Sequence, residues 1–159
     1  MTVPESWGTR AFRWLFNVFP AYRGTGARVV HIAHDWSEVR VRLTLHWRTR
    51  NYVGTIFGGS MYGAIDPVYM MMLMRQLGPD YIVWDKAATI RFRKPGREPL
   101  FAMFLITPSD LSEIRDAVSA NGKTEKEFAI DLVSASGEVH ASFTKLLSIR
   151  HRSHPTRSH

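Results

Sequence analysis

Residues 51–78, NYVGTIFGGSMYGAIDPVYMMMLMRQLG, decide the fold of this chain. The segment opens with polar residues, passes through the pair Gly58-Gly59, and then becomes the most apolar run of the sequence. Between residues 60 and 77 the only charged residues are Asp66 and Arg75. A helix over these residues would be roughly 28 Å long. Its apolar side chains point to every side, so we expect a central helix that is buried all round.

Asp66 stands out within this run, because an unpaired carboxylate is costly to bury and tends to be paired, protonated or used. Two interpretations of the dipeptide Asp66-Pro67 are open. Asp66 could be the N-cap of a helix that begins there, with Pro67 at its first position. Alternatively, the helix begins near Gly59, and the ring of Pro67 kinks it beside the acid.

The glycines and methionines of the segment each have a structural and a functional interpretation. Gly58-Gly59 is either an ordinary turn from a strand into a helix or part of a site. The methionine cluster that includes Met70 either packs the core or lines a pocket for variable apolar chains, since thioethers are flexible. The residues themselves do not separate these interpretations.

Composition limits the class of protein. The chain has 159 residues and a hydrophobic content of 45%, which predicts one globular domain over residues 1–150. Residues 151–159 form a basic tail without periodicity, expected to be mobile. The absence of cysteine excludes disulfides, thiolate metal sites and cysteine nucleophiles, and it fits a cytoplasmic location. The net charge of +7 suggests an anionic partner: a nucleic acid, a membrane surface or a phosphate-bearing molecule such as coenzyme A.

The rest of the chain predicts a sheet around the central helix. An amphipathic helix over 11–18 is expected to cover an edge or end of this sheet, with binding to a membrane surface as the less favoured interpretation. Asp66, Pro67 and Arg75 interrupt the apolar run, so we expect no stable membrane insertion. A second short helix is expected at 109–120 with Ser109 as its N-cap. Strands are predicted at 27–34, 38–47, 81–93, 100–107, 127–134 and 139–150. The fold class is therefore α+β, with an antiparallel sheet of about six strands wrapped around one long helix.

Several segments resemble a known family. The series Asn51, Gly54, Phe57-Gly58-Gly59 and Asp66 resembles the signature N-x-G-x-x-x-H-G-G plus a helical acid, found in hotdog-fold thioesterases of the phenylacetyl-CoA type. ATIRFRKPG at 88–96 is similar to that family's S-I-x-F-x-R-P-G segment. NYVGTIFGGS, DPVY, VWDKAATIRF and the terminal hairpin resemble the DUF4442 branch of this superfamily, over about residues 16–150. In this chain Gly54 is displaced by one residue, Phe57 stands where the signature has histidine, and Pro67 follows the acid.

The resemblance implies a hotdog fold, a homodimer or a dimer of dimers (a homotetramer), and hydrolysis of an acyl thioester. In that family's chemistry, the backbone N–H of Gly58 would polarise the thioester carbonyl, and Asp66 from the partner subunit would act as base or nucleophile. Asn51 would position the water or the carbonyl. The substrate, including its coenzyme A phosphates, would be bound by Phe57, Gly59, Met70, Arg91, Arg93 and Lys94.

The main alternative is a non-catalytic hotdog protein that binds acyl-CoA or an acyl chain, and the missing histidine favours it. A hotdog dehydratase needs a histidine base, and the sequence has none between His46 and His140. We expect no metal and no cofactor apart from the coenzyme A moiety of the substrate. We also expect no nucleic-acid partner, because few aromatic residues alternate with the basic ones. The adjacent Asp85 and Lys86 are interpreted as a possible ion pair.

Overall fold

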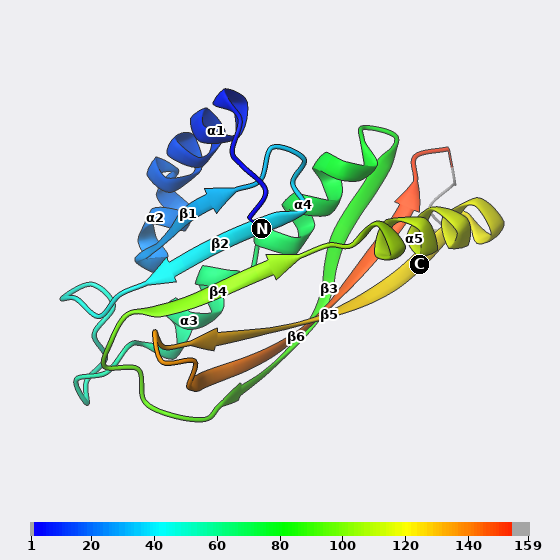
Figure 1. Cartoon of the computed structure of the whole chain (residues 1–159). Helices are drawn as coiled ribbons and strands as arrows, with labels where there is room; N and C mark the ends of the chain where they lie inside the picture. Colours follow the sequence, from blue (N-terminus) through cyan, green and yellow to red (C-terminus); the bar gives the residue numbers. More distant parts are fainter. Residues whose placement is uncertain (1, 154–159) are drawn as a thin grey trace.

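The structure is a computed structural model that describes residues 2–153. Its six strands form one antiparallel sheet in the order β1-β2-β4-β5-β6-β3, and five helices accompany it (Figure 1). The strands are β1 (Ala27–Ile32), β2 (Glu38–Leu43), β3 (Tyr81–Phe92), β4 (Leu100–Leu105), β5 (Lys123–Val133) and β6 (Val139–His151). The helices are α1 (Trp7–Val18), α2 (Pro20–Thr25), α3 (Gly58–Ile65), α4 (Val68–Leu77) and α5 (Pro108–Asn121). The predicted α+β class, with about six antiparallel strands around a central helix, is confirmed.

The central helix is divided at the dipeptide Asp66-Pro67. Helix α3 begins at Gly58, and α4 continues after Pro67, whose ring and missing N–H interrupt the ladder of helical hydrogen bonds. Asp66 keeps helical dihedral angles at the end of α3, and no side chain caps the start of α4. The interpretation with a helix that begins near Gly59 and is kinked by Pro67 is therefore confirmed, and the interpretation of Asp66 as an N-cap is wrong.

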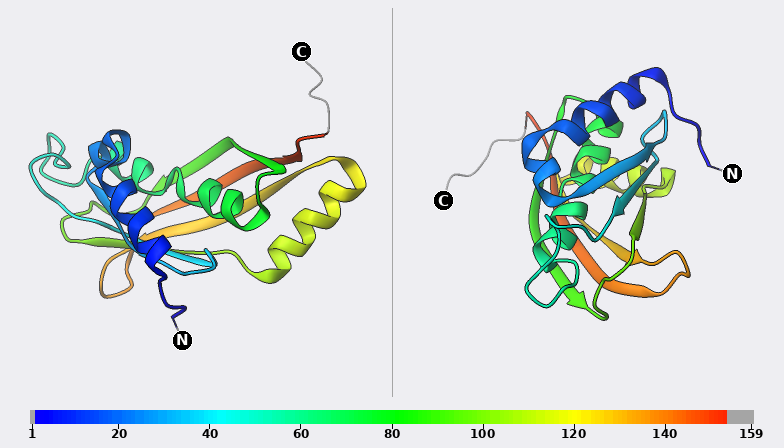
Figure 2. Two further views of the ribbon diagram at one scale, coloured as in Figure 1. Left: turned by 90° about the horizontal axis from the view of Figure 1, so that it is seen from above. Right: turned by 90° about the vertical axis from the view of Figure 1, so that its left-hand side faces the viewer.

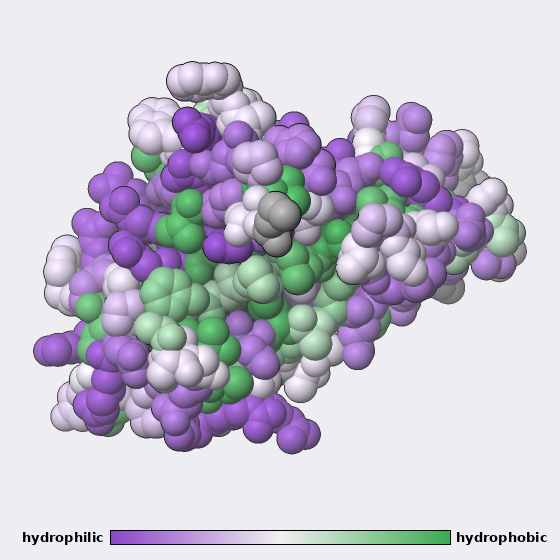
Figure 3. Space-filling model, viewed as in Figure 1, coloured by the Kyte–Doolittle hydropathy of each residue, from purple (hydrophilic) through white to green (hydrophobic). Residues whose placement is uncertain are grey.

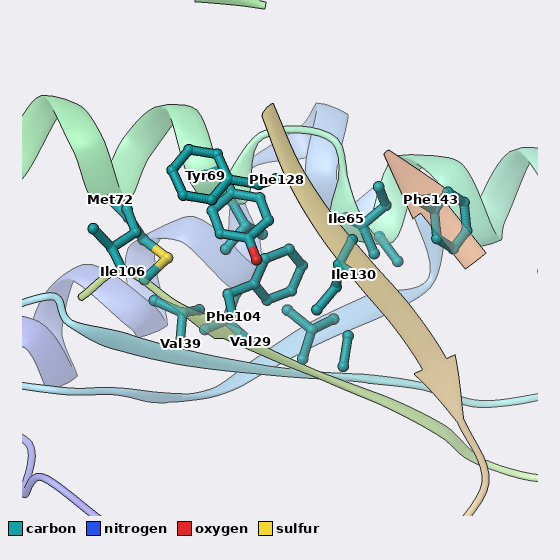
Figure 4. Close-up of a cluster of buried hydrophobic side chains, with 14 of the residues drawn as sticks. Val29, Val39, Ile65, Tyr69, Met72, Phe104, Ile106, Phe128, Ile130 and Phe143 are labelled. Carbon is teal, nitrogen blue, oxygen red and sulfur yellow. The ribbon is translucent and has the colours of Figure 1, made fainter. Parts of the chain in front are cut away.

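One side of this divided helix forms the core with the sheet. Ala64, Ile65, Val68, Met72 and Leu73 are completely buried. Figure 4 shows how side chains of α4 meet those of the strands. The Tyr69 ring stacks on Phe128 with centroids 4.4 Å apart, and it meets the edge of Phe104 at 5.0 Å.

The opposite side of the helix is not covered within one chain. Met74 is exposed and Met71 is only half-buried, whereas the neighbouring Met70 reaches the core. The expectation of a helix buried all round is thus wrong for the single chain, because the sheet covers one side of it.

The two edges of the sheet differ. At the β1 edge, the Asn17 side chain of α1 donates to the carbonyl of Val29 and accepts from its N–H, both at 2.8 Å. Glu5 accepts from the N–H of Ile32 at 3.0 Å. These side chains occupy backbone groups that a further strand would use. The β3 edge carries exposed residues along most of its length, including Trp84 and Phe92.

Several predicted boundaries were wrong. Helix α1 begins at Trp7, not at residue 11, because Ser6 and Thr9 form a capping box. Strand β2 ends at Leu43, not at residue 47. Helix α5 is capped by Thr107, not Ser109, with Asp110 as the reciprocal acid and Pro108 in the first turn. The remaining predicted elements differ in their ends by a few residues, and α2 was missed.

The predicted tail at 151–159 is partly bound to the domain. His151 belongs to β6, and the N–H of Arg152 donates to the carbonyl of Asp80 at 2.8 Å. Residues 154–159 lie outside the described residues. Within residues 2–153, no helix has the length and apolar character needed to cross a bilayer.

Candidate active site

A pocket of about 400 Å³ opens at the N-terminal end of α3. It collects four of the residues predicted for the site, although they come from three segments of the chain: Gly58 from α3, Asn51 from the loop before it, and Arg93 and Lys94 from the residues that follow β3. The other lining residues are Thr55, Ile56, Met61, Phe92 and Pro95. The pocket therefore combines an apolar wall with backbone and cationic groups, as small-molecule sites commonly do.

Gly58 is the first residue of α3, and the N-cap Phe57 offers its backbone no side-chain acceptor. The first N–H groups of a helix have no partner within the helix and carry the positive end of its dipole. A Cβ atom at Gly58 would lie 2.9 Å from the ring of Phe92, so glycine allows this close approach. The start of α3 thus presents backbone N–H groups beside the pocket.

Asn51 is committed to its own loop. Its Nδ2 donates to Thr55 Oγ1 at 2.8 Å, and its Oδ1 accepts from the N–H of Thr55 at 2.9 Å. Phe57 is exposed, and its ring lies over Gly59, where an added Cβ would meet it at 2.3 Å. Neither Phe57 nor Gly59 lines the pocket. The two hydrogen bonds with Thr55 thus give Asn51 a role in shaping its loop, whereas Phe57 and Gly59 lie outside the pocket lining.

Both cationic residues of the pocket already have partners. The Arg93 side chain donates to Ser142 Oγ at 2.8 Å, and Lys94 forms an ion pair with Glu138. Both are exposed, so a phosphate at the rim could exchange with these partners. Arg91 is also exposed but does not line the pocket, and Met70 packs against the core away from it.

Asp66 belongs to a second cluster, at the junction of α3 and α4. Lys145 of β6 donates from Nζ to Asp66 Oδ1 at 2.6 Å, and the same Nζ lies 3.0 Å from Oδ1 of Asp85 on β3. The Lys145 side chain is only 1% exposed, whereas that of Asp66 is 42% exposed. The ring of Tyr62 lies over the ammonium group at 5.3 Å. Asp66 is therefore held from the protein side and open on the other side.

Burial and pairing oppose one another in this cluster. Burial alone lowers the pKa of the Lys145 ammonium, but the hydrogen bond to Asp66 and the contact with Asp85 outweigh it and raise that pKa above 10.5. Burial raises the pKa of the Asp85 carboxyl, although Lys145 acts in the other direction. Burial is the largest cause that raises the pKa of the Tyr62 hydroxyl, and the neighbouring Asp66 raises it further. Lys145 is thus a positive charge at neutral pH.

The sequence analysis missed Lys145, Asp85 and Tyr62 as members of this cluster. The expected ion pair between Asp85 and Lys86 is wrong. A bulge interrupts the register of β3 between Asp85 and Ala87, and Lys86 pairs with Glu125 at 2.5 Å, whereas Asp85 lies beside Lys145. A signal for Lys145 was present: it is the one charged residue among the buried, alternate positions of β6 at 141, 143, 145, 147 and 149.

Gly58 and Asp66 of one chain cannot act on the same thioester. They lie eight residues apart on one helical course, which corresponds to about 12 Å along its axis. A reacting carbonyl needs the oxyanion donor within about 3 Å and a base that reaches it directly or through one water. Any site that uses both residues therefore requires two chains.

Residues 2–153 hold no group of three or more histidine, aspartate and glutamate side chains arranged for a metal ion. The tail histidines at 154 and 159 lie outside these residues.

Comparison with known proteins gives one family and several related structures. The family model described as "Domain of unknown function (DUF4442)" matches residues 8–149. No curated protein sequence matches the chain.

The related structures share the fold at low sequence identity. A protein of unknown function from Pseudomonas aeruginosa, described as a probable thioesterase, superposes with a TM-score of 0.80 at 20% identity, covering 94% of this chain and 99% of that one. A thioesterase from Haemophilus influenzae gives 0.68 at 12% identity over 100% of both chains. The PaaI protein of the Escherichia coli phenylacetic acid degradation operon gives 0.62 at 17% identity, over 93% of this chain and 94% of that one. These likenesses establish the hotdog fold.

Proposed function

Because the chain belongs to the DUF4442 family and has the hotdog fold, we propose that it is an acyl-CoA thioesterase whose active site is shared by two chains. The observation that carries the proposal is the uncapped start of α3, which faces a pocket with Arg93 and Lys94 at its rim. The thioesterases named among the related structures support the reaction class.

The reaction follows from the chemistry of the groups. The thioester carbonyl lies against the N–H of Gly58, which stabilises the oxygen as negative charge develops on it. Asp66 of the second chain removes a proton from water while the water oxygen bonds to the carbonyl carbon. The C–S bond then breaks, and the departing thiolate takes up the proton. In the other form of the proposal, the Asp66 carboxylate attacks the carbonyl carbon and displaces the thiolate, and water then hydrolyses the resulting anhydride and supplies the proton of the thiol.

The open β3 edge supports the pairing of two chains. Two copies of β3 can continue the sheet across a two-fold axis, whereas Asn17 and Glu5 occupy the β1 edge. Such pairing places the uncovered side of the central helix toward the partner. For a dimer of dimers we propose a second contact through the outer face of β4, where an apolar band crosses the molecule over exposed Met103 and Leu105 (Figure 3).

Lys145 is a positioning residue in this proposal. Its ammonium fixes one oxygen of Asp66, and Asp66 keeps its other oxygen for the substrate. The predicted cytoplasmic location, where coenzyme A thioesters are available, stays a prediction.

The test is release of thiol from a panel of acyl-CoAs that differ in chain length. We expect turnover that falls at least about a hundredfold in Asp66→Asn. Gly58→Pro removes the N–H yet suits the first position of a helix, so kcat should fall about 10²–10³-fold. Gly58→Ala is the matched control: it adds the same contact with Phe92 but keeps the N–H, and it should retain most of the activity. Equal activity in both glycine variants would reject the oxyanion role.

The alternative function is acyl-CoA binding without hydrolysis. Two observations favour it: Phe57 stands where the family signature has histidine, and Asp66 is already engaged by Lys145. Calorimetric binding of acyl-CoA together with no thiol release, in the unmodified protein and in Asp66→Asn alike, would establish this alternative.

A further inference from the structure

Helix α1 presents an apolar stripe that no other element covers. Trp7, Trp14 and Leu15 are 86%, 68% and 59% exposed, and Ala11 and Val18 are exposed as well. Their spacing of i, i+4, i+7, i+8 and i+11 places all five on one side of the helix. The helix lies on the outside of the molecule beside β1 (Figure 2).

The opposite side of α1 is the one that packs. Phe12 meets Trp36 with ring centroids 4.9 Å apart, and Phe16 meets Tyr22 at 4.4 Å. The predicted cover over the sheet edge is therefore made by the side of α1 that carries the phenylalanines, together with Asn17. The helix is also fixed by its capping box and by the ion pair of Arg13 with Glu5 at 2.8 Å. The exposed stripe is thus held in a defined orientation.

Basic residues surround this stripe. A pocket of about 640 Å³ beside α1 is lined by arginines from four segments, together with Trp14 and Trp47. Within residues 2–153, Arg23, Arg28 and Arg48 form no ion pair with an acidic side chain. Residues 2–50 contain eight arginines and only three acidic residues. The neighbourhood of the stripe is therefore strongly cationic.

We propose that α1 docks the protein on an anionic lipid surface. The apolar stripe enters the boundary between headgroups and acyl chains, where indole rings are favoured. The unpaired arginines then lie at the level of the headgroup phosphates and attract a negatively charged leaflet. Neither the apolar contacts nor the charges suffice alone, and together they supply the two contributions that peripheral binding requires.

A second copy of the chain is the competing occupant. The dimer proposed above uses β3, which lies at the opposite edge of the sheet from β1. The arginines around α1 would also face their own copies in a symmetric contact, and like charges oppose such a contact. An anionic bilayer matches both features of the patch.

The test is co-sedimentation of the full chain with phospholipid vesicles. We expect binding to vesicles of equal parts phosphatidylcholine and phosphatidylglycerol, and little binding to phosphatidylcholine alone. The double variant Trp14→Ser, Leu15→Ser should lose about a hundredfold in partitioning, about tenfold for each buried side chain. Arg23→Gln and Arg28→Gln should each cost about fivefold. Binding should weaken at about 1 M salt, where the screening length is about 3 Å.

A matched variant controls for nonspecific effects. Lys123→Gln removes an exposed charge at the start of β5 and should not change binding by more than about twofold. Equal sedimentation with neutral and anionic vesicles, or unchanged binding by the double variant, would overturn the proposal. A failure to bind any vesicle would also overturn the proposal. In that case, a smaller assembly of the double variant in analytical ultracentrifugation would identify the stripe as a contact between copies of the chain. The assay measures binding to vesicles and not release of thiol, so its outcome does not depend on the proposed thioesterase activity.

Discussion

Replacing Lys145 by methionine should destabilise the protein more than any surface substitution. The side chain has nearly the same length but no charge, so the change leaves Asp66 and Asp85 without the ammonium that lies 2.6 and 3.0 Å from them. Two carboxylates would then face each other without a cation between them, at a position closed to water because the Lys145 side chain is only 1% exposed.

The expected magnitude follows from how far each partner is buried. Removing one member of a fully buried ion pair costs about 3–5 kcal/mol. Asp66 is 42% exposed, and its loss is partly screened by solvent, whereas Asp85 is 25% exposed. We therefore expect a loss of about 3 kcal/mol in the free energy of unfolding. For a chain of this size that corresponds to a melting temperature lower by about 10 °C.

Urea unfolding at pH 7 and constant protein concentration measures this loss. Lys123→Met, an exposed lysine, is the matched control and should change stability by less than about 0.5 kcal/mol. Adding Asp66→Asn and Asp85→Asn to Lys145→Met should restore the stability to within about 1 kcal/mol, because a neutral cluster needs no ammonium. A Lys145→Met protein as stable as the control, or a triple variant no better than the single one, would refute the reasoning.

Three further predictions concern a cap, the β3 edge and pH. Thr107→Ala removes the N-cap of α5 and should cost about 1 kcal/mol in urea unfolding; no loss would exclude the capping box as a source of stability. The double variant Ala87→Asp, Thr89→Asp places like charges on the β3 edge, so the proposed dimer should dissociate in analytical ultracentrifugation. Ser119→Asp on α5 is the control and should leave the dimer intact. A double variant that remains dimeric would exclude pairing through β3. The pKa of Lys145 is raised above 10.5, so its stabilisation is complete below that pH and is lost as pH rises through the higher folded-state value. Melting curves should therefore begin to converge on those of Lys145→Met only above pH 10.5.

The fold was predictable because its signals are local and agree with one another. Val39, Val41 and Leu43 alternate with Arg40 and Arg42, and the structure buries the first set on one face of β2. The apolar run between residues 60 and 77 predicted a helix in the core, and the predicted strands supplied the sheet that covers one side of it. The predicted helix start was wrong where two nearby residues can both serve as the N-cap, as Thr107 and Ser109 can for α5.

Helix α1 shows where periodicity fails to decide. Its sequence has two aromatic stripes, one with Trp7 and Trp14 and another with Phe12 and Phe16. Both satisfy the spacing of a buried face, and only packing against Trp36 and Tyr22 determines which one turns inward.

The site was predictable in part. The motif located Gly58 at the start of the helix and Asp66 near its kink, and the structure confirms both places. Lys145 was missed because its partners are 79 and 60 residues away in the chain, and a single sequence does not show which strands become neighbours. The amide interactions of Asn51 with Thr55 were likewise hidden in loop geometry.

Complementation between two inactive chains tests the shared site most directly. Asp66→Asn and Gly58→Pro proteins should each be inactive alone, yet a re-equilibrated mixture should release thiol from acyl-CoA. A mixed dimer has one site that combines an intact Gly58 with an intact Asp66, so the mixture should reach about a quarter of the unmodified activity. A mixture in which mixed dimers form but no activity returns would show that the two residues do not act across the interface.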